Sequence, residues 1–185
     1  MPANWNFRPA GPADAGAIAA LHADSWRRHY RGAYSDAFLD GDVVLDRLGV
    51  WTDRLNRRDP GSRTIVAEPE GALIGFAHVV FDEDPTWGAL LDNLHVADPH
   101  RRRGVGSGLL TQVTMAIAGR RHRTGLHLWV LEQNADAQGF YEAHGAKRVE
   151  RARVAPPGGI ASRLDGSPHK LRYAWDDPIA LDRQP

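Results

Sequence analysis

The sequence of 185 residues predicts an α+β domain in which strands pair mainly antiparallel and helices flank the sheet. Thr64–Glu68 and Leu73–Phe81 lie on either side of a short PEG turn, which is typical of a β-hairpin. Near the end of the chain, KRVERARV and HKLRYAWDD are joined by a loop and can pair in the same antiparallel way. A third observation is an apolar stripe with helical spacing, formed by Val105, Leu109, Val113, Ala116 and Ile117.

The first sixty residues are expected to contain one strand and then two or three helices. NWNFRPA predicts a short strand closed by Pro9. Asp14 to about His29 is predicted to be a helix, because its apolar residues recur near helical spacing. Gly32 ends that helix, and one or two further helices follow before Pro60.

The rest of the chain alternates strands and helices. Trp87–Val96 is expected to be a strand, Gly106 to about Arg123 a helix and GLHLWVLE a buried strand. NADAQGFYEAHGA then forms a short helix that ends at Gly145. Because no repeat, low-complexity tract or linker is present, we expect residues 1–185 to form a single domain, with 178–185 as a loose tail.

Composition excludes several classes of protein. Lys and Arg together number 23, as do Asp and Glu, so the net charge is zero, whereas proteins that bind nucleic acid usually carry a basic excess. The sequence has no apolar run of membrane-spanning length and no signal-peptide core. It has no cysteine, which excludes disulfides and thiolate zinc sites and fits a cytoplasmic protein.

The segment HVADPHRRRGVGSGLL places three arginines beside three alternating glycines, directly before the helical stripe. Backbone N–H groups at a helix N-terminus lack partners, and glycines let the backbone curl around an anion such as phosphate. Arginines add permanent positive charge. The segment therefore favours a pyrophosphate bound where the helix begins near Gly106, over the alternative of a solvated basic loop followed by a flexible helix cap.

Three other glycine motifs do not fit the spacing. A Walker loop ends in Gly-Lys-Ser/Thr, which is absent. A dinucleotide-binding loop directly follows its strand and needs a third glycine where Leu109 stands. A nucleophile elbow needs Gly-x-Ser-x-Gly, but Gly106 directly precedes Ser107.

Two segments resemble the GNAT (Gcn5-related N-acetyltransferase) superfamily. The acetyl-CoA motif of that family, Arg/Gln-x-x-Gly-x-Gly/Ala, is matched by Arg101, Gly104 and Gly106. The segment LEQNADAQGFYEAHGAKRV resembles a later family segment, in register at Asn134, Ala137, Phe140, Tyr141, Glu142 and Gly145. The resemblance covers essentially the whole chain. It implies a mixed, mostly antiparallel central sheet with a splay between the strands that end near Val96 and Val130.

The resemblance implies acetyl-CoA as cosubstrate, with its pantetheine lying along the strand like an added strand at Leu94 and Val96. The pyrophosphate is expected on backbone amides from Arg102 to Ser107, and only some of the three arginines are expected to touch phosphate. Asn134 is expected to bind the pantetheine arm, to cap the following helix, or both. The implied cofactor-binding residues are Leu94, Val96, Arg101, Arg102, Arg103, Gly104, Val105, Gly106, Ser107, Asn134 and Tyr141.

The resemblance also implies that Tyr141 is the acid that protonates the leaving thiolate and that the Val96 N–H binds the oxyanion. The alternative for Tyr141 is a tyrosine packed on a helix face. Strand alternation places Asp92 on the face of Leu94 and Val96, so Asp92 is the best-placed base, directly or through water. A structural or acceptor-binding role is the alternative for Asp92.

Other base candidates are weaker. Alternation places His95 on the opposite face, where packing or hydrogen bonding is the better interpretation. His78, followed by Asp82 and Glu83, is a further candidate. On the acceptor side, four aromatic residues are candidates for a wall of the binding site: Trp26, Tyr30, Tyr34 and Phe38. For Trp26 and Phe38, packing in the core is the preferred interpretation.

The predicted function is transfer of an acetyl group from acetyl-CoA to a primary amine of a small molecule or peptide, directly in a ternary complex. The alternatives are a non-catalytic acyl-CoA-binding protein and an acyltransferase that uses another acyl-CoA. The nine histidines show no zinc-binding spacing, so no metal is expected. No nucleic-acid or membrane partner is expected, and a homodimer is left open.

Overall fold

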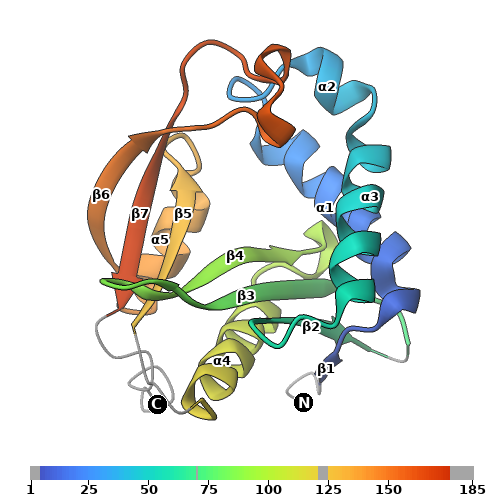
Figure 1. Ribbon diagram of the computed structural model, residues 1–185, viewed down its shortest axis with the longest axis vertical. Helices are drawn as coiled ribbons and strands as arrows, with labels where there is room; N and C mark the ends of the chain where they lie inside the picture. Colours follow the sequence, from blue (N-terminus) through green and yellow to red (C-terminus); the bar gives the residue numbers. More distant parts are fainter. Residues whose placement is uncertain (1–4, 70, 121–124, 176–185) are drawn as a thin grey trace.

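The computed structural model describes residues 5–69, 71–120 and 125–175 (Figure 1). In this part of the chain, seven strands form one sheet in the order β1-β2-β3-β4-β5-β7-β6. Neighbouring strands are antiparallel except β4 and β5, which are parallel. The mixed, mostly antiparallel sheet flanked by helices is thus confirmed. None of the described helices has the length and apolar character needed to span a membrane.

Every predicted strand and helix is present. The strands are β1 (Asn6–Pro9), β2 (Ser62–Glu68), β3 (Gly75–Asp84), β4 (Gly88–Val96), β5 (Leu126–Leu131), β6 (Lys147–Arg153) and β7 (His169–Trp175). The helices are α1 (Ala15–His29), α2 (Asp36–Asp40), α3 (Val43–Arg57), α4 (Val105–Ala118) and α5 (Ala135–Ala143).

Two predicted boundaries are wrong by three residues or more. The strand expected to end at Phe81 continues to Asp84. The helix expected to reach about Arg123 ends at Ala118, where Gly119 caps it. Glycine is a poor helix former, so it ends the helix although the polar residues after it fit a helical pattern. Residues 121–124 and the predicted loose tail at 178–185 lie outside the described residues.

The helices cover both faces of the sheet (Figure 1). On one face, the apolar stripe of α4 packs with β2, β3, β4 and β5, and Leu109 and Val113 are fully buried there. On the other face, α1 and α3 pack through Ile18 and Trp51 against Phe76 of β3. Truncating such a buried side chain to alanine typically costs about 2–5 kcal/mol, so these two layers stabilise the fold.

Strands β4 and β5 separate soon after they meet, which confirms the predicted splay (Figure 1). Among the described residues, they pair at Ala89 with Leu126 and at Leu90 with His127. From Leu91 onward, the edge of β4 that would face β5 is without a partner strand among the described residues. An unpaired edge of this kind presents backbone N–H and C=O groups to a ligand.

A β-bulge in β4 overturns the predicted alternation of its side chains. His78 pairs with Asn93 and Val79 pairs with Leu91, so Asp92 is an extra residue between them. A bulge shifts the side-chain period by one residue. Asp92 therefore does not share the face of Leu94 and Val96.

The contacts of β4 show the new arrangement. Leu94 and Val96 pack against the core that contains α4. Asp92 forms an ion pair with Arg54 of α3, and His95 contacts Ser25 of α1. Asp92 and His95 thus lie on the same side of the sheet, toward α1 and α3.

Candidate active site

A cavity of about 580 Å³ lies where β4 and β5 separate. Its walls come from α1, β4, the loop before α4, the first turn of α4, β5 and α5. The predicted site residues that line it are Asp92, Leu94, Val96, Arg101, Arg102, Gly104, Gly106, Ser107, Asn134 and Tyr141. The structure therefore brings most of the predicted residues to one place, although they are spread over fifty positions of the sequence.

Arg103 and Val105 do not line the cavity. The Val105 side chain is buried in the core, because this position belongs to the apolar stripe of α4. The carbonyl of Arg103 accepts a hydrogen bond from Nε1 of Trp5, the residue before β1, at 3.1 Å.

The loop before α4 has the backbone shape of an anion-binding nest. Arg102 and Gly104 both have left-handed backbone, with φ of 57° and 84°. Helix α4 begins at Val105 without a side-chain cap, so the amides of its first turn remain available to a ligand. Left-handed residues that precede a helix turn successive N–H groups toward one point, where an anion is stabilised.

The two arginines that line the nest have different partners. Arg101 forms an ion pair with Asp136 at 3.2 Å and a longer one with Asp98 at 3.7 Å. Within the described part of the chain, Arg102 forms no ion pair. The Arg101 guanidinium thus ties the loop to α5, whereas the Arg102 guanidinium is available to a ligand.

A histidine that sequence reasoning missed also lines the nest. His144 Nδ1 lies 2.7 Å from the Phe140 carbonyl, and Nε2 lies 2.9 Å from Ser107 Oγ. Because a carbonyl only accepts, Nδ1 donates to it, and Nε2 is the ring nitrogen left to contact the Ser107 hydroxyl. No sequence spacing signals this contact, because it joins two helices through the fold.

Tyr141 lies in α5 with its side chain buried against Phe140 and Trp175. Burial raises the pKa of the Tyr141 phenol well above its usual value, so the hydroxyl keeps its proton at neutral pH. Asn134 caps α5, since its Oδ1 accepts from the Ala137 N–H at 3.2 Å. The capping alternative for Asn134 is therefore confirmed, and it is compatible with a second role in the cavity.

The aromatic residues of α1 and α2 divide between core and cavity. Trp26, Tyr34 and Phe38 are buried in a common cluster, which confirms the preference for core packing of Trp26 and Phe38. Of the predicted aromatic wall, Tyr30 alone lines the cavity. Burial and the nearby Asp92 carboxylate raise the pKa of Tyr30 to about 12.

The predicted base and its rivals occupy different environments. Asp92 lines the cavity, but its Oδ2 lies 2.8 Å from Arg54 and accepts from the Asn93 amide at 2.7 Å. His95 also lines the cavity, which corrects its assignment to the far face. His78 does not line it: the ring is buried, and Nδ1 lies 2.8 Å from Thr64 Oγ1.

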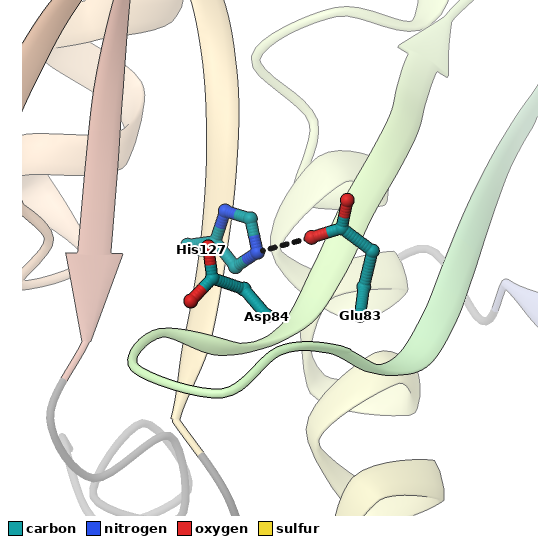
Figure 2. A group of neighbouring side chains, drawn as sticks. All are labelled: Glu83, Asp84 and His127. Atoms are coloured by element: carbon teal, nitrogen blue, oxygen red, sulfur yellow. Dashed lines mark hydrogen bonds and ion pairs between the residues drawn. The ribbon is translucent and has the colours of Figure 1, made fainter.

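Glu83, Asp84 and His127 form a separate cluster beyond the cavity (Figure 2). Their ligand-type atoms lie within 4.8 Å of one another, and His127 Nε2 lies 3.1 Å from Glu83. Asp84 is already engaged, because its Oδ2 accepts from Arg172 at 2.9 Å and its Oδ1 accepts from the amides of Thr86 and Trp87. A cation would have to displace Arg172, so we interpret the cluster as a network that joins β3 to β5 by the His127–Glu83 hydrogen bond and to β7 by the Asp84–Arg172 ion pair.

Comparison with known proteins places this geometry in a family. The model of the Acetyltransferase (GNAT) family matches residues 21–146. A probable N-acetyltransferase, Rv2775, of Mycobacterium tuberculosis is 28% identical over 144 residues, which cover 76% of this chain and 79% of that protein. An uncharacterized N-acetyltransferase of Bacillus subtilis, YuaI, is 24% identical over 134 residues, which cover 71% and 74% of the two chains.

Solved structures show the same fold. The PaiA N-acetyltransferase of Thermoplasma acidophilum, crystallised in complex with coenzyme A, superposes with a TM-score of 0.71 at 18% identity. That match covers 93% of this chain and 99% of the other. A GCN5-related N-acetyltransferase of Rhodopseudomonas palustris gives a TM-score of 0.67 at 22% identity and covers 95% and 98%. With a family model that spans the splayed strands, the glycine loop and α5, the chain belongs to the GNAT acetyltransferase family.

Proposed function

We propose that this protein transfers an acetyl group from acetyl-CoA to a primary amine, directly within a ternary complex of enzyme, acetyl-CoA and amine. The observation that carries the proposal is that one cavity joins the nest at α4, the open edge of β4 and Tyr141. A bound coenzyme would thus contact the same cavity with its phosphates, its pantetheine arm and its thioester. The volume of the cavity is typical of a site for a small molecule.

The proposed coenzyme position follows from the backbone. Ala97 N–H donates to the Ile74 carbonyl across the β3 side. Since successive amides of a strand point to opposite edges, the N–H of Val96 points to the open edge. Val96 and Leu94 thus offer their backbone groups to pantetheine, and the pyrophosphate lies on the nest, with Arg102 beside it. The coenzyme A complex of the Thermoplasma neighbour supports this choice of cosubstrate.

The proposed chemistry uses two groups of the cavity. The neutral amine attacks the thioester carbonyl, and the oxyanion accepts from the Val96 N–H. The Tyr141 hydroxyl gives its proton to the departing thiolate. The Tyr141 phenol is protonated at neutral pH, as a proton donor must be.

We assign Asp92 to the binding of the acceptor. Its Oδ2 is already engaged, because it forms an ion pair with Arg54 at 2.8 Å and accepts from the Asn93 side-chain amide at 2.7 Å. Its Oδ1 is available, within the described residues, to attract an ammonium group. The sequence-based assignment of Asp92 as the base stays a prediction, and the experiments below separate the two roles.

Calorimetry with acetyl-CoA, coenzyme A and dephospho-CoA tests the cofactor before any acceptor is known. We expect micromolar binding of the first two and weaker binding of the third, which lacks the 3′-phosphate. Thiol release is then followed with tyramine, spermidine, L-lysine and a short peptide with a free N-terminus. No binding of coenzyme A would overturn the proposal. Binding without transfer favours an acyl-CoA-binding role, and faster transfer from propionyl-CoA favours another acyl donor.

A further inference from the structure

A group of two buried and two half-buried polar side chains lies between α1, α3 and β4, beside the cavity. Its members are His22 and Ser25 of α1, Trp51 of α3 and His95 of β4. His22 and Trp51 are almost completely buried, with exposed fractions of 2% and 0%. Burying polar groups costs free energy that apolar residues of similar size would avoid. None of these four residues has a role in the proposed function.

The contacts hold the His95 ring in one orientation. Trp51 Nε1 donates to His22 Nδ1 at 3.0 Å, and because indole only donates, the His22 proton lies on Nε2. The ring of His22 lies 4.6 Å from that of His95, and the ring of Phe76 lies 5.2 Å from it, measured between centroids. The His95 ring thus packs against His22, whose orientation is fixed by Trp51, and against Phe76 of the core.

The remaining contact of His95 selects one ring nitrogen. His95 Nδ1 lies 2.8 Å from Ser25 Oγ, which occupies this nitrogen. Nε2 has no partner among the described residues, although the ring lines the cavity beside Tyr30 and Asp92. Nε2 is therefore the nitrogen of His95 that can meet a ligand.

Titratable and charged groups around His95 come from each neighbouring element. They are His22 and His29 of α1, Arg47 of α3 and Asp92 of β4. Burial lowers the pKa of His95 to about 4, with a further lowering by His29 and Arg47 that Asp92 opposes. The ring is neutral near pH 7 and has a lone pair available.

We propose that His95 Nε2 takes the proton from the acceptor amine and that Ser25 is the positioning residue that accepts from His95 Nδ1–H. This inference rests on the proposed function. As the amine nitrogen bonds to the thioester carbon, an N–H bond breaks and its proton passes to Nε2. The C–S bond then breaks, and the thiolate takes the proton of Tyr141. His95 then releases its proton to solvent and Tyr141 takes one from solvent, so amine and acetyl-CoA give amide and coenzyme A.

The kinetic test compares pH profiles of kcat from pH 3.5 to 9.5, a range that includes the lowered pKa of His95, with whichever of the four probe amines reacts fastest. We expect His95→Gln to lower kcat by about 100-fold or more, as for loss of a general base, and to remove the acidic limb of the profile. Ser25→Ala is expected to lower kcat less and to shift that limb, whereas Ser25→Thr restores it. The matched control is His169→Gln on β7, outside the cavity, which should leave the profile unchanged.

Coenzyme A affinity and circular dichroism of each variant show whether it is folded, and His95→Asn serves as a second variant if His95→Gln is not. The inference is overturned if His95→Gln keeps kcat within threefold and its acidic limb. Loss of both in Asp92→Asn alone would make Asp92 the base. An Asp92→Asn variant that raises KM and keeps the limb agrees with acceptor binding.

A second test needs no acceptor. In the coenzyme A complex labelled with ¹⁵N-histidine, NMR at pH 7 should show His95 protonated on Nδ1 and unprotonated on Nε2. The opposite tautomer overturns the inference while coenzyme A binding keeps the proposed function intact. Absence of coenzyme A binding overturns both.

Discussion

Gly104 illustrates how one residue shapes the nest. Its φ of 84° is left-handed, and a Cβ built there would meet no atom within 4 Å. A side chain at this position is therefore opposed by backbone strain and, if acidic, by repulsion of the proposed phosphate, but not by a clash. Asparagine tolerates left-handed backbone better than most residues and has nearly the shape of aspartate.

The pair Gly104→Asn and Gly104→Asp separates strain from charge. We expect Gly104→Asn to weaken coenzyme A binding about tenfold, since left-handed strain costs on the order of 1 kcal/mol. Gly104→Asp should weaken it by a further factor of ten or more, because the carboxylate opposes the pyrophosphate. Calorimetry measures both. Equal affinities of the two variants would contradict a phosphate at this loop.

Tyr141 allows a test of the proposed acid. Tyr141→Phe removes only the hydroxyl, and the ring still fills its place between Phe140 and Trp175. We expect kcat to fall by about 100-fold, as for loss of a general acid, with coenzyme A affinity changed less than twofold. Steady-state kinetics and calorimetry check this. An unchanged kcat would assign Tyr141 to packing alone.

At the scale of the element, α4 packs so closely on β1 that it needs a glycine. A Cβ on Gly108 would lie 2.3 Å from Phe7 Cζ and 3.0 Å from Cε2. Glycine is otherwise a poor choice within a helix, where alanine is better by about 0.5–1 kcal/mol. Close packing against Phe7 is the reason for Gly108.

Gly108→Ala should therefore destabilise the protein by about 1–3 kcal/mol, as overpacking does, although helix propensity alone predicts stabilisation. The matched control is Gly49→Ala in α3, where a Cβ meets nothing within 4 Å, and a gain of about 0.5–1 kcal/mol is expected. Urea unfolding measures both. The double variant Gly108→Ala/Phe7→Leu should recover part of the loss, and no recovery would exclude the clash with Phe7.

At the scale of the whole molecule, buried neutral histidines make stability depend on pH. Burial lowers the pKa of His78 and of His95 from 6.5 to about 4, and it also lowers the pKa of His22. Between pH 6.5 and about 4, these histidines bind protons in the unfolded chain but not in the folded chain. The free energy of unfolding therefore falls as pH falls from about 6.5 to 4.

Urea unfolding between pH 7.5 and 4.5 should show this loss, with up to about 3 kcal/mol from each of His78 and His95. His78→Gln should flatten the dependence, since it removes one titrating group, whereas His169→Gln should not. A slope that is the same in both variants would mean that other groups dominate the acid sensitivity.

The sequence by itself determined the order and type of the elements, the family and the position of the nest. Hydrophobic periodicity and turn residues are local signals, and they predicted every strand and helix with boundary errors such as the end of α4. The motif residues Arg101, Gly104 and Gly106 are also local, so the loop that lines the cavity could be found without a structure.

Only the tertiary structure decided which side chains of β4 meet the cavity. The bulge at Asp92 depends on how β4 pairs with β3, and one extra residue reverses the side of every residue after it. Period-two reasoning therefore separated His95 from Asp92, whereas the fold places both beside Tyr30. The partners Ser25, Arg54 and His144 were equally hidden, because contacts between residues distant in sequence form only when the sheet and helices pack together.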